Sequence, residues 1–73
     1  MPALPVLSGR EVVREFGSFG WQLVRQSGSH MIMTKTGEIA SLSIPDHKEV
    51  ARGTLRKLIR AANLTVEEFV SVI

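Results

Sequence analysis

The sequence contains no cysteine. Without cysteine, neither a disulfide nor a thiolate metal site can stabilise this small fold, and no thiol is available as a nucleophile. The absence is compatible with the reducing environment of the cytoplasm. We expect a cytoplasmic protein, although the absence of cysteine does not prove this location.

Long apolar runs are also absent. A membrane-spanning helix needs about 20 consecutive apolar residues, and no segment supplies them, so we expect no membrane contact. Residues 1–7 lack a positively charged region and are interrupted by Pro2 and Pro5, so we expect no signal peptide. We interpret residues 1–7 as an extended arm of one domain that spans residues 1–73.

Size and charge narrow the classes of function. A chain of 73 residues buries only about 60% of the surface that it exposes when unfolded, which favours a shallow surface site over a deep cavity. The net charge of +2 is too small to indicate a nucleic-acid partner by itself. Four basic residues nevertheless crowd into one stretch, which is typical of an anion-binding surface: Arg52, Arg56, Lys57 and Arg60.

Capping signals and apolar spacing predict the helices. Ser8 and Glu11 fit a capping box, and an apolar stripe after them predicts a helix over residues 9–19 that ends before Gly20. Gly53 or Thr54 is expected to cap a second helix. Asn63 is expected to stop it, and a second capping box at residues 65–68 opens a short final helix with four inward apolar residues: Val66, Phe69, Val70 and Ile73.

Strand-forming residues between glycine-containing turns predict three strands, over residues 21–26, 30–35 and 39–44. A tight hairpin turn is expected at residues 36–38. The alternation of side chains places the apolar residues of the last two strands on one face: Met31, Met33, Ala40, Leu42 and Ile44. The opposite, wetter face receives His30, Thr34, Ser41 and Ser43, although Ile32 fits this pattern poorly.

The order of these elements predicts an α+β fold of helix, three strands, helix and short helix. Its sheet is three-stranded and antiparallel, with the helices covering one face. This order resembles the double-stranded-RNA-binding fold.

The run Gly28-Ser29-His30 is the strongest candidate for chemistry. An imidazole with an ordinary pKa near ~6.5 can both accept and donate a proton at neutral pH. His30 is the proposed acid or base, against the simpler interpretation of a strand histidine with no function. Gly28 can let a phosphate approach the backbone, or it serves only the turn. Ser29 can donate to a phosphate oxygen, or it only caps the turn.

The remaining candidates each have a simpler alternative. Arg52, Arg56, Lys57 and Arg60, with the amides of Gly53 and Thr54, can bind phosphates, or they form a solvated helix face. His47 is a candidate second acid, base or phosphate ligand, or it is an exposed loop residue. A further alternative is that His30, Asp46 and His47 together bind a metal ion. Trp21 can stack on a base or belong to the core.

Several short sequence motifs, in their order and spacing, resemble those of the HicA family of toxins from bacterial toxin–antitoxin modules. They are Ser8-Gly9-Arg10-Glu11-Val12, Arg25-Gln26-Ser27-Gly28-Ser29-His30, Ile44-Pro45-Asp46-His47-Lys48-Glu49-Val50, Gly53-Thr54-Leu55-Arg56-Lys57-Leu58-Ile59-Arg60 and Glu67-Glu68-Phe69. The match runs from about Ser8 to the C-terminus.

The resemblance implies a small ribonuclease that cleaves mRNA and is neutralised by a HicB-type antitoxin. In the family, the histidine of the Gly-Ser-His motif is catalytic, and it corresponds to His30. Asn63 stands where a glycine is usual. We therefore expect a metal-independent endoribonuclease with no cofactor. A non-catalytic RNA-binding module of the same fold and a protein-interaction domain that uses the basic face are the alternatives.

Overall fold

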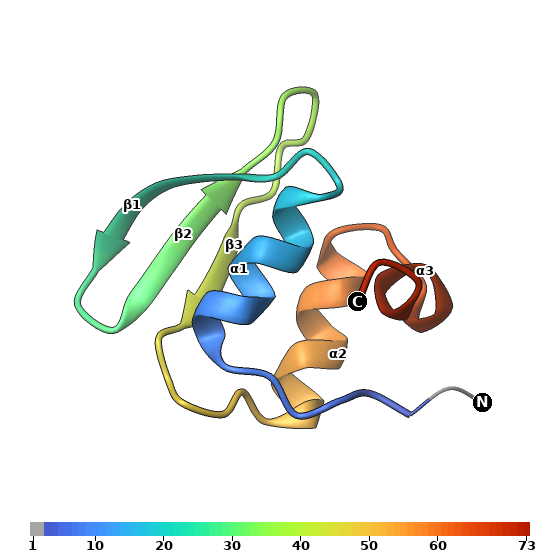
Figure 1. Cartoon of the computed structure of the whole chain (residues 1–73). Coiled ribbons are helices and arrows are strands. Elements are labelled where there is room, and N and C mark those ends of the chain that lie inside the picture. Colours follow the sequence, from blue (N-terminus) through green and yellow to red (C-terminus); the bar gives the residue numbers. More distant parts are fainter. Residues whose placement is uncertain (1–2) are drawn as a thin grey trace.

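The computed structural model describes residues 3–73, so Met1 and Pro2, the start of the predicted arm, lie outside the described residues. Figure 1 shows the order of elements: α1 (Gly9–Gly17), β1 (Gln22–Ser27), β2 (His30–Thr34), β3 (Leu42–Pro45), α2 (Arg52–Ala61) and α3 (Val66–Val70). The strands form one antiparallel sheet in the order β1-β2-β3. The predicted α+β fold is confirmed, and α1 and α2 lie on the same side of the sheet (Figure 1).

Both predicted capping boxes are present. The Ser8 hydroxyl accepts from the Glu11 amide at 3.2 Å, and the Ser8 amide donates to the Glu11 carboxylate at 3.0 Å. Thr65 and Glu68 make the same reciprocal pair at 3.1 and 2.9 Å. These pairs satisfy amides that a helix start otherwise leaves without partners, so they define where α1 and α3 begin.

The predicted cap of α2 is wrong. The helix begins at Arg52, and its N-cap position is Ala51, whose side chain makes no capping hydrogen bond. The carbonyl of Ala51 accepts from the amide of Leu55 at 2.9 Å. Because Leu55 is fully buried, its packing fixes this first turn without help from Gly53 or Thr54. Asn63 does adopt the predicted left-handed conformation, with φ of 60°.

The third strand begins later than predicted. Leu42 of β3 pairs with Met33 of β2, and β2 ends at Thr34, so residues 35–41 connect the two strands. A turn closed by the Glu38 amide and the Lys35 carbonyl, at 3.0 Å, lies within this connection. Ile39 is fully exposed and Ala40 is exposed, so the prediction that Ala40 belongs to the core face is wrong. A short hairpin turn was predicted because nothing local to Ile39 distinguishes a loop residue from a strand residue.

One core lies between the sheet and the helices, and it draws buried side chains from most of the chain: Leu4, Leu7, Val12, Phe16, Trp21, Met31, Met33, Leu42, Ile44, Val50, Leu55, Leu58, Ile59, Ala62 and Phe69. The rings of Phe16 and Phe69 meet with centroids 5.2 Å apart, which ties α3 to α1.

The burial of single residues decides several predictions. Met31 and Met33 are core residues as predicted. Trp21 is only 3% exposed, so its side chain is not available to stack on a base. Ile73 is 56% exposed, which contradicts its predicted inward position, because α3 ends at Val70. Among residues 3–73, no helix has the length and apolarity needed to cross a membrane.

Candidate active site

A two-residue turn places His30 at the tip of the β1–β2 hairpin. Ser27 and His30 pair across the strands, so Gly28 and Ser29 alone make the turn. Gly28 has a φ of 59°, a conformation that glycine adopts without steric cost. A Cβ at Gly28 would meet no atom within 4 Å, so this position needs glycine for its backbone angle and is open to an approaching ligand.

The imidazole of His30 lies on the face of the sheet that the helices do not cover. Its neighbours Met31 and Met33 bury the opposite face in the order expected from strand alternation. Nδ1 of His30 lies 3.3 Å from Oγ of Ser43 on β3. Because Ser43 engages Nδ1, Nε2 is the ring nitrogen left for a further hydrogen-bond partner.

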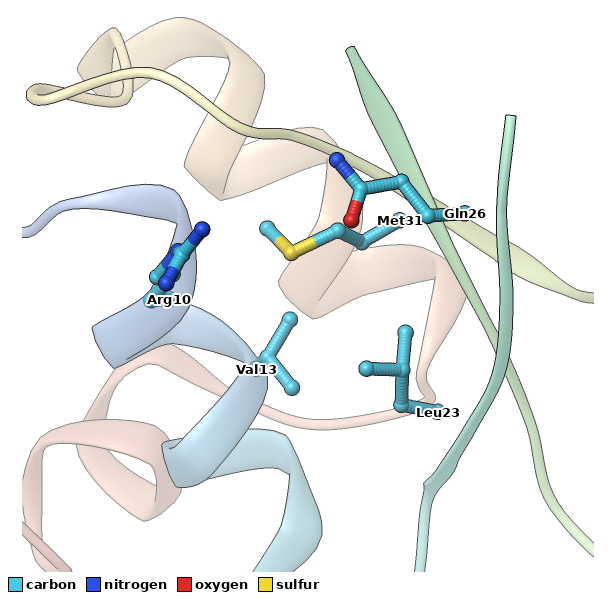
Figure 2. Close-up of a pocket in the computed structure, with 5 residues that line it drawn as sticks. All are labelled: Arg10, Val13, Leu23, Gln26 and Met31. Carbon is cyan, nitrogen blue, oxygen red and sulfur yellow. The ribbon is translucent and has the colours of Figure 1, made fainter. Parts of the chain in front are cut away.

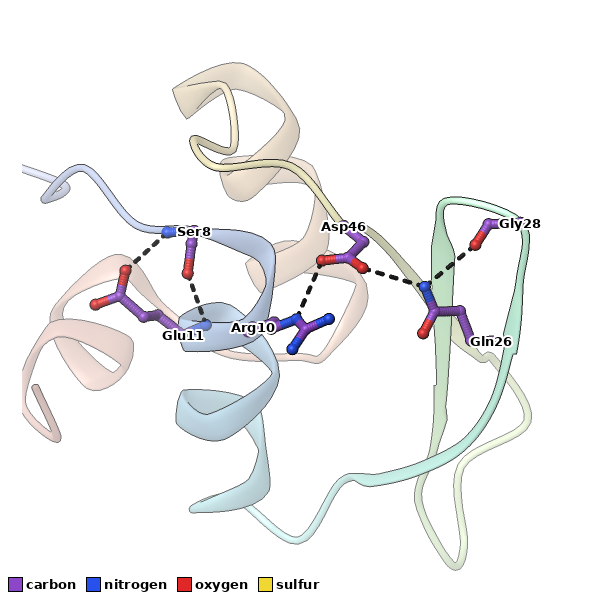
Figure 3. A network of polar contacts seen from close by, with 6 residues as sticks. All are labelled: Ser8, Arg10, Glu11, Gln26, Gly28 and Asp46. Atoms are coloured by element: carbon purple, nitrogen blue, oxygen red, sulfur yellow. Dashed lines mark hydrogen bonds and ion pairs between the residues drawn. The ribbon is translucent and has the colours of Figure 1, made fainter.

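A polar network centred on Asp46 holds the turn that precedes His30 (Figure 3). The Asp46 amide donates to the Ser29 carbonyl at 2.7 Å. Nε2 of Gln26 donates to Oδ2 of Asp46 at 3.1 Å and to the Gly28 carbonyl at 3.2 Å. Nε of Arg10 forms an ion pair with Oδ1 of Asp46 at 3.5 Å. The network therefore joins α1, β1, the turn and the β3–α2 loop.

Arg10 and Gln26 are functional candidates that the sequence does not predict, and Asp46 was considered only as a metal ligand. Among residues 3–73, no group of three or more histidine, aspartate or glutamate residues is placed to hold a metal ion. The suggested cluster of His30, Asp46 and His47 is therefore not formed. Residues 10, 26 and 46 have no spacing that marks them as neighbours, and only the fold brings them together.

The absence of a side chain at Gly9 lets the start of α1 pack closely against the backbone at Pro45 and Asp46. A Cβ on Gly9 would overlap the carbonyl oxygen of Pro45 and lie 3.1 Å from Cα of Asp46. The Gly9 amide donates to the His47 carbonyl at 2.9 Å. Close approach at glycine thus fixes the backbone that carries Asp46.

An open groove of about 360 Å³ separates α1 from the hairpin (Figure 2). Val13, Leu23 and Met31 give it apolar walls, and Arg10 and Gln26 add polar groups. All six residues of β1 are exposed. The groove follows the helix-facing side of the hairpin, so it lies on the opposite side from the His30 imidazole.

The structure does not bring His47 to His30. His47 is exposed in the β3–α2 loop and lines a separate hollow of about 190 Å³ with Ser8, Arg10 and Lys48, next to Asp46. This hollow adjoins the start of α1, whereas the His30 imidazole contacts Ser43 on the uncovered face of the sheet.

The four basic candidates lie on the outer side of α2. Its inner side buries Leu55, Leu58 and Ile59, and the exposed positions include Arg52, Arg56, Lys57 and Arg60. Since α2 packs against the covered side of the sheet, the structure does not place this basic face beside His30 (Figure 1).

Comparisons with known proteins agree on one relationship. A family model described as the HicA toxin of bacterial toxin–antitoxin systems matches residues 9–64, which include the hairpin, Asp46 and α2. A solved structure of a toxin–antitoxin complex from Streptococcus pneumoniae contains a chain with 32% sequence identity and a TM-score of 0.71. That match covers 80% of the present chain and 98% of the other. A comparison with curated proteins found no match.

Proposed function

This chain belongs to the HicA family of toxins from bacterial toxin–antitoxin systems, and on that premise we propose that it is an endoribonuclease that cleaves mRNA without a metal ion. His30 is the proposed catalytic residue. The observation that supports this most directly is its position: an imidazole at the tip of a hairpin, on the uncovered sheet face, held through Nδ1 by Ser43.

RNA supplies its own nucleophile for this reaction. The 2′-hydroxyl attacks the adjacent phosphorus, a new P–O bond forms, and the bond to the 5′-oxygen of the next nucleotide breaks. One proton must leave the 2′-hydroxyl and one must reach the departing 5′-oxygen. Nε2 of His30 carries one of these two transfers, and a positioned histidine typically contributes about 10²- to 10⁴-fold. DNA lacks the 2′-hydroxyl and is not a substrate for this chemistry.

The turn before His30 is the proposed site for the scissile phosphate. Gly28 and Ser29 are exposed, and the space around Gly28 is open. A phosphate oxygen can therefore come close to the backbone there, and the Ser29 hydroxyl can donate to it. Backbone and hydroxyl donors of this kind stabilise the charge that develops on phosphorus.

Arg52, Arg56, Lys57 and Arg60 are proposed to bind phosphates of the RNA outside the reacting site. Their exposure on α2 supports contact with a flexible polyanion. Because α2 packs on the covered side of the sheet, their contribution is to affinity, not to the chemical step. His47 lines a hollow at the start of α1, and it is not assigned a part in proton transfer.

The proposed protein partner is a HicB-type antitoxin that blocks the toxin. The similar chain of known structure comes from a toxin–antitoxin complex, which supports a partner of this class. Since both the mRNA and such an antitoxin are found in the cytoplasm, we place the protein there.

The test incubates purified protein with RNA in EDTA and compares wild type with His30→Ala and His47→Ala. We expect wild type and His47→Ala to cleave and His30→Ala to leave the RNA intact. His47→Ala is the matched control because it removes the other histidine of the chain. Cleavage by His30→Ala, or a requirement for added metal, would reject the mechanism. RNA that is retained by wild type but never cut would instead support the non-catalytic binding module.

A further inference from the structure

We propose that Asp46 is a positioning residue that holds the Gly28–Ser29 turn, and with it His30, in the geometry needed for RNA cleavage. This inference rests on the proposed function of His30. It assigns Asp46 no contact with RNA, since its carboxylate is already engaged by Arg10 and Gln26.

The hairpin tip needs such an anchor because the core does not hold it. β1 is an edge strand, and none of its six residues is buried. On β2 the first core side chain is Met31, so the turn itself lies beyond the core. Edge segments with few buried contacts open easily unless polar contacts tie them to the body of the protein.

Among the described residues, the hydrogen bonds to the two turn carbonyls come from Asp46 and from its partner Gln26. The Asp46 amide binds the Ser29 carbonyl at 2.7 Å. Oδ2 of Asp46 receives Nε2 of Gln26 at 3.1 Å, and the same nitrogen holds the Gly28 carbonyl at 3.2 Å. Both carbonyls of the turn are therefore fixed, one by the Asp46 backbone and the other by an amide group that the Asp46 side chain orients. Of these hydrogen bonds, the one between Gln26 and the Asp46 carboxylate is charge-assisted and is therefore stronger than the neutral ones.

Asp46 is itself held firmly enough to serve as an anchor. Its side chain is 22% exposed and pairs through Oδ1 with Arg10 of α1, but the Arg10 side chain is 79% exposed, so the backbone contacts at Gly9 hold Asp46 more than this ion pair does. Gly9 packs against its backbone, and the adjacent His47 carbonyl accepts from the Gly9 amide. Figure 3 shows the resulting chain of contacts from α1 through Asp46 to the turn. The Asp46 carboxylate thus connects the helix to the hairpin, because Oδ1 contacts Arg10 of α1 and Oδ2 contacts Gln26 of β1.

Loss of this anchor should affect the chemical step more than RNA binding. A displacement of about 1 Å in a catalytic group can reduce a rate by about 10²-fold. The proposed phosphate contacts on α2 are outside the network and remain in place. We therefore expect Asp46→Ala and Gln26→Ala to lower kcat by about 10-fold or more, with KM changed by less than about 2-fold.

A double-mutant cycle tests whether the two residues act as one unit. If Asp46 acts through Gln26, the double variant loses little more activity than the stronger single variant. Asp46→Asn keeps one oxygen acceptor and should recover part of the activity lost in Asp46→Ala. Glu49→Ala is the matched control, because Glu49 is an exposed acid in the same loop, and it should retain wild-type kcat. Fully additive effects, or wild-type kcat in Asp46→Ala, would overturn the inference.

A second measurement does not depend on activity. ¹⁵N relaxation of Gly28, Ser29 and His30 should give order parameters near the rigid value of about 0.85 in wild type and near or below about 0.6 in Asp46→Ala. The Met33 amide in the sheet serves as the internal control and should not change. Unchanged order at the turn in Asp46→Ala would refute the positioning role.

The two readouts separate this inference from the proposed function. If wild type fails to cleave RNA, the proposed function fails, and the relaxation data alone decide whether Asp46 orders the turn. If wild type cleaves RNA and Asp46→Ala cleaves equally well with an ordered turn, the proposed function stands and this inference fails.

Discussion

His30 and Ser43 meet on the uncovered face of the sheet, where Nδ1 of the imidazole lies 3.3 Å from the serine Oγ. The residues come from adjacent strands. Ser43 pairs with Ile32, which is two residues after His30, so the contact between His30 and Ser43 is a diagonal one. The contact limits rotation of the ring and engages Nδ1, so Nε2 is the nitrogen left for another partner. An exposed strand histidine without such a partner would sample several ring orientations, so Ser43 contributes order where the core cannot.

Ser43→Ala should slow RNA cleavage without unfolding the protein. A hydrogen bond of this kind contributes about 0.5–1.5 kcal/mol, which corresponds to about 2- to 12-fold in kcat if it is fully used to orient the ring. Single-turnover cleavage at saturating protein measures the effect. Ser41→Ala is the control, because Ser41 is an exposed serine in the loop before β3. Equal rates for the two variants would show that Ser43 does not orient His30.

Local signals predicted most of the fold. Both capping boxes, the glycine turns at Gly20 and Gly28 and the left-handed Asn63 are where residue chemistry placed them. The start of β3 was mispredicted because strand pairing, not the local pattern, excludes Ile39. The cap of α2 was mispredicted because the burial of a side chain sets that helix start.

The candidate site was predictable only in part. His30 was proposed from its place beside the Gly28–Ser29 turn and from the resemblance to the HicA family, and its catalytic role stays a prediction. The Asp46 network could not, because it joins residues from α1, β1 and the β3–α2 loop that no sequence spacing relates. Helical spacing correctly predicted that Arg56 and Arg60 share an exposed face, but the side of the sheet that α2 covers depends on topology.

Gly9→Ala should destabilise the protein, whereas Gly17→Ala in the same helix should not. A Cβ at Gly9 would overlap the Pro45 carbonyl, so the backbone must shift, and overpacking of this kind costs about 1–3 kcal/mol. A Cβ at Gly17 meets nothing within 4 Å, and because Gly17 is the last residue of α1, alanine there should stabilise the helix by less than the ~0.5–1 kcal/mol expected in a helix interior. Urea unfolding of both variants measures the difference. Similar midpoints would show that α1 does not pack closely on the Pro45–Asp46 backbone.

Glu11 should make stability depend on acid pH. Its pKa is below the ordinary value of 4.5, first because the Ser8 backbone amide donates to its carboxylate, with the Ser8 hydroxyl and the charge of Arg14 adding to the effect. Because the folded-state pKa is the lower one, the stabilisation is present above 4.5 and is lost as the pH falls through the folded value.

Glu11→Gln tests this relationship while keeping a side chain that can complete the capping box. We expect the variant to be less stable than wild type near neutral pH and the two to converge below pH 4.5, as Glu11 becomes protonated in wild type. Urea midpoints across an acid pH series provide the measurement. A difference in stability that stays constant with pH would show that the charge of Glu11 does not contribute.

The basic face of α2 should govern the affinity for RNA and not the rate of its cleavage. Replacement of Arg56, Lys57 and Arg60 by alanine removes three exposed cations from the outer side of the helix. For single-stranded RNA, each lost phosphate contact lowers the slope of log affinity against log salt by about 0.7, so the triple variant should lose about 2 from the slope.

Binding is measured in the His30→Ala background, where the RNA is expected to stay intact, and kcat is measured separately in the variant that retains His30. We expect weaker, less salt-sensitive binding and an unchanged kcat, since α2 packs on the side of the sheet opposite the His30 imidazole. An unchanged salt slope would show that RNA does not follow this helix. A fall in kcat at saturating RNA would show that the helix contributes to the chemical step.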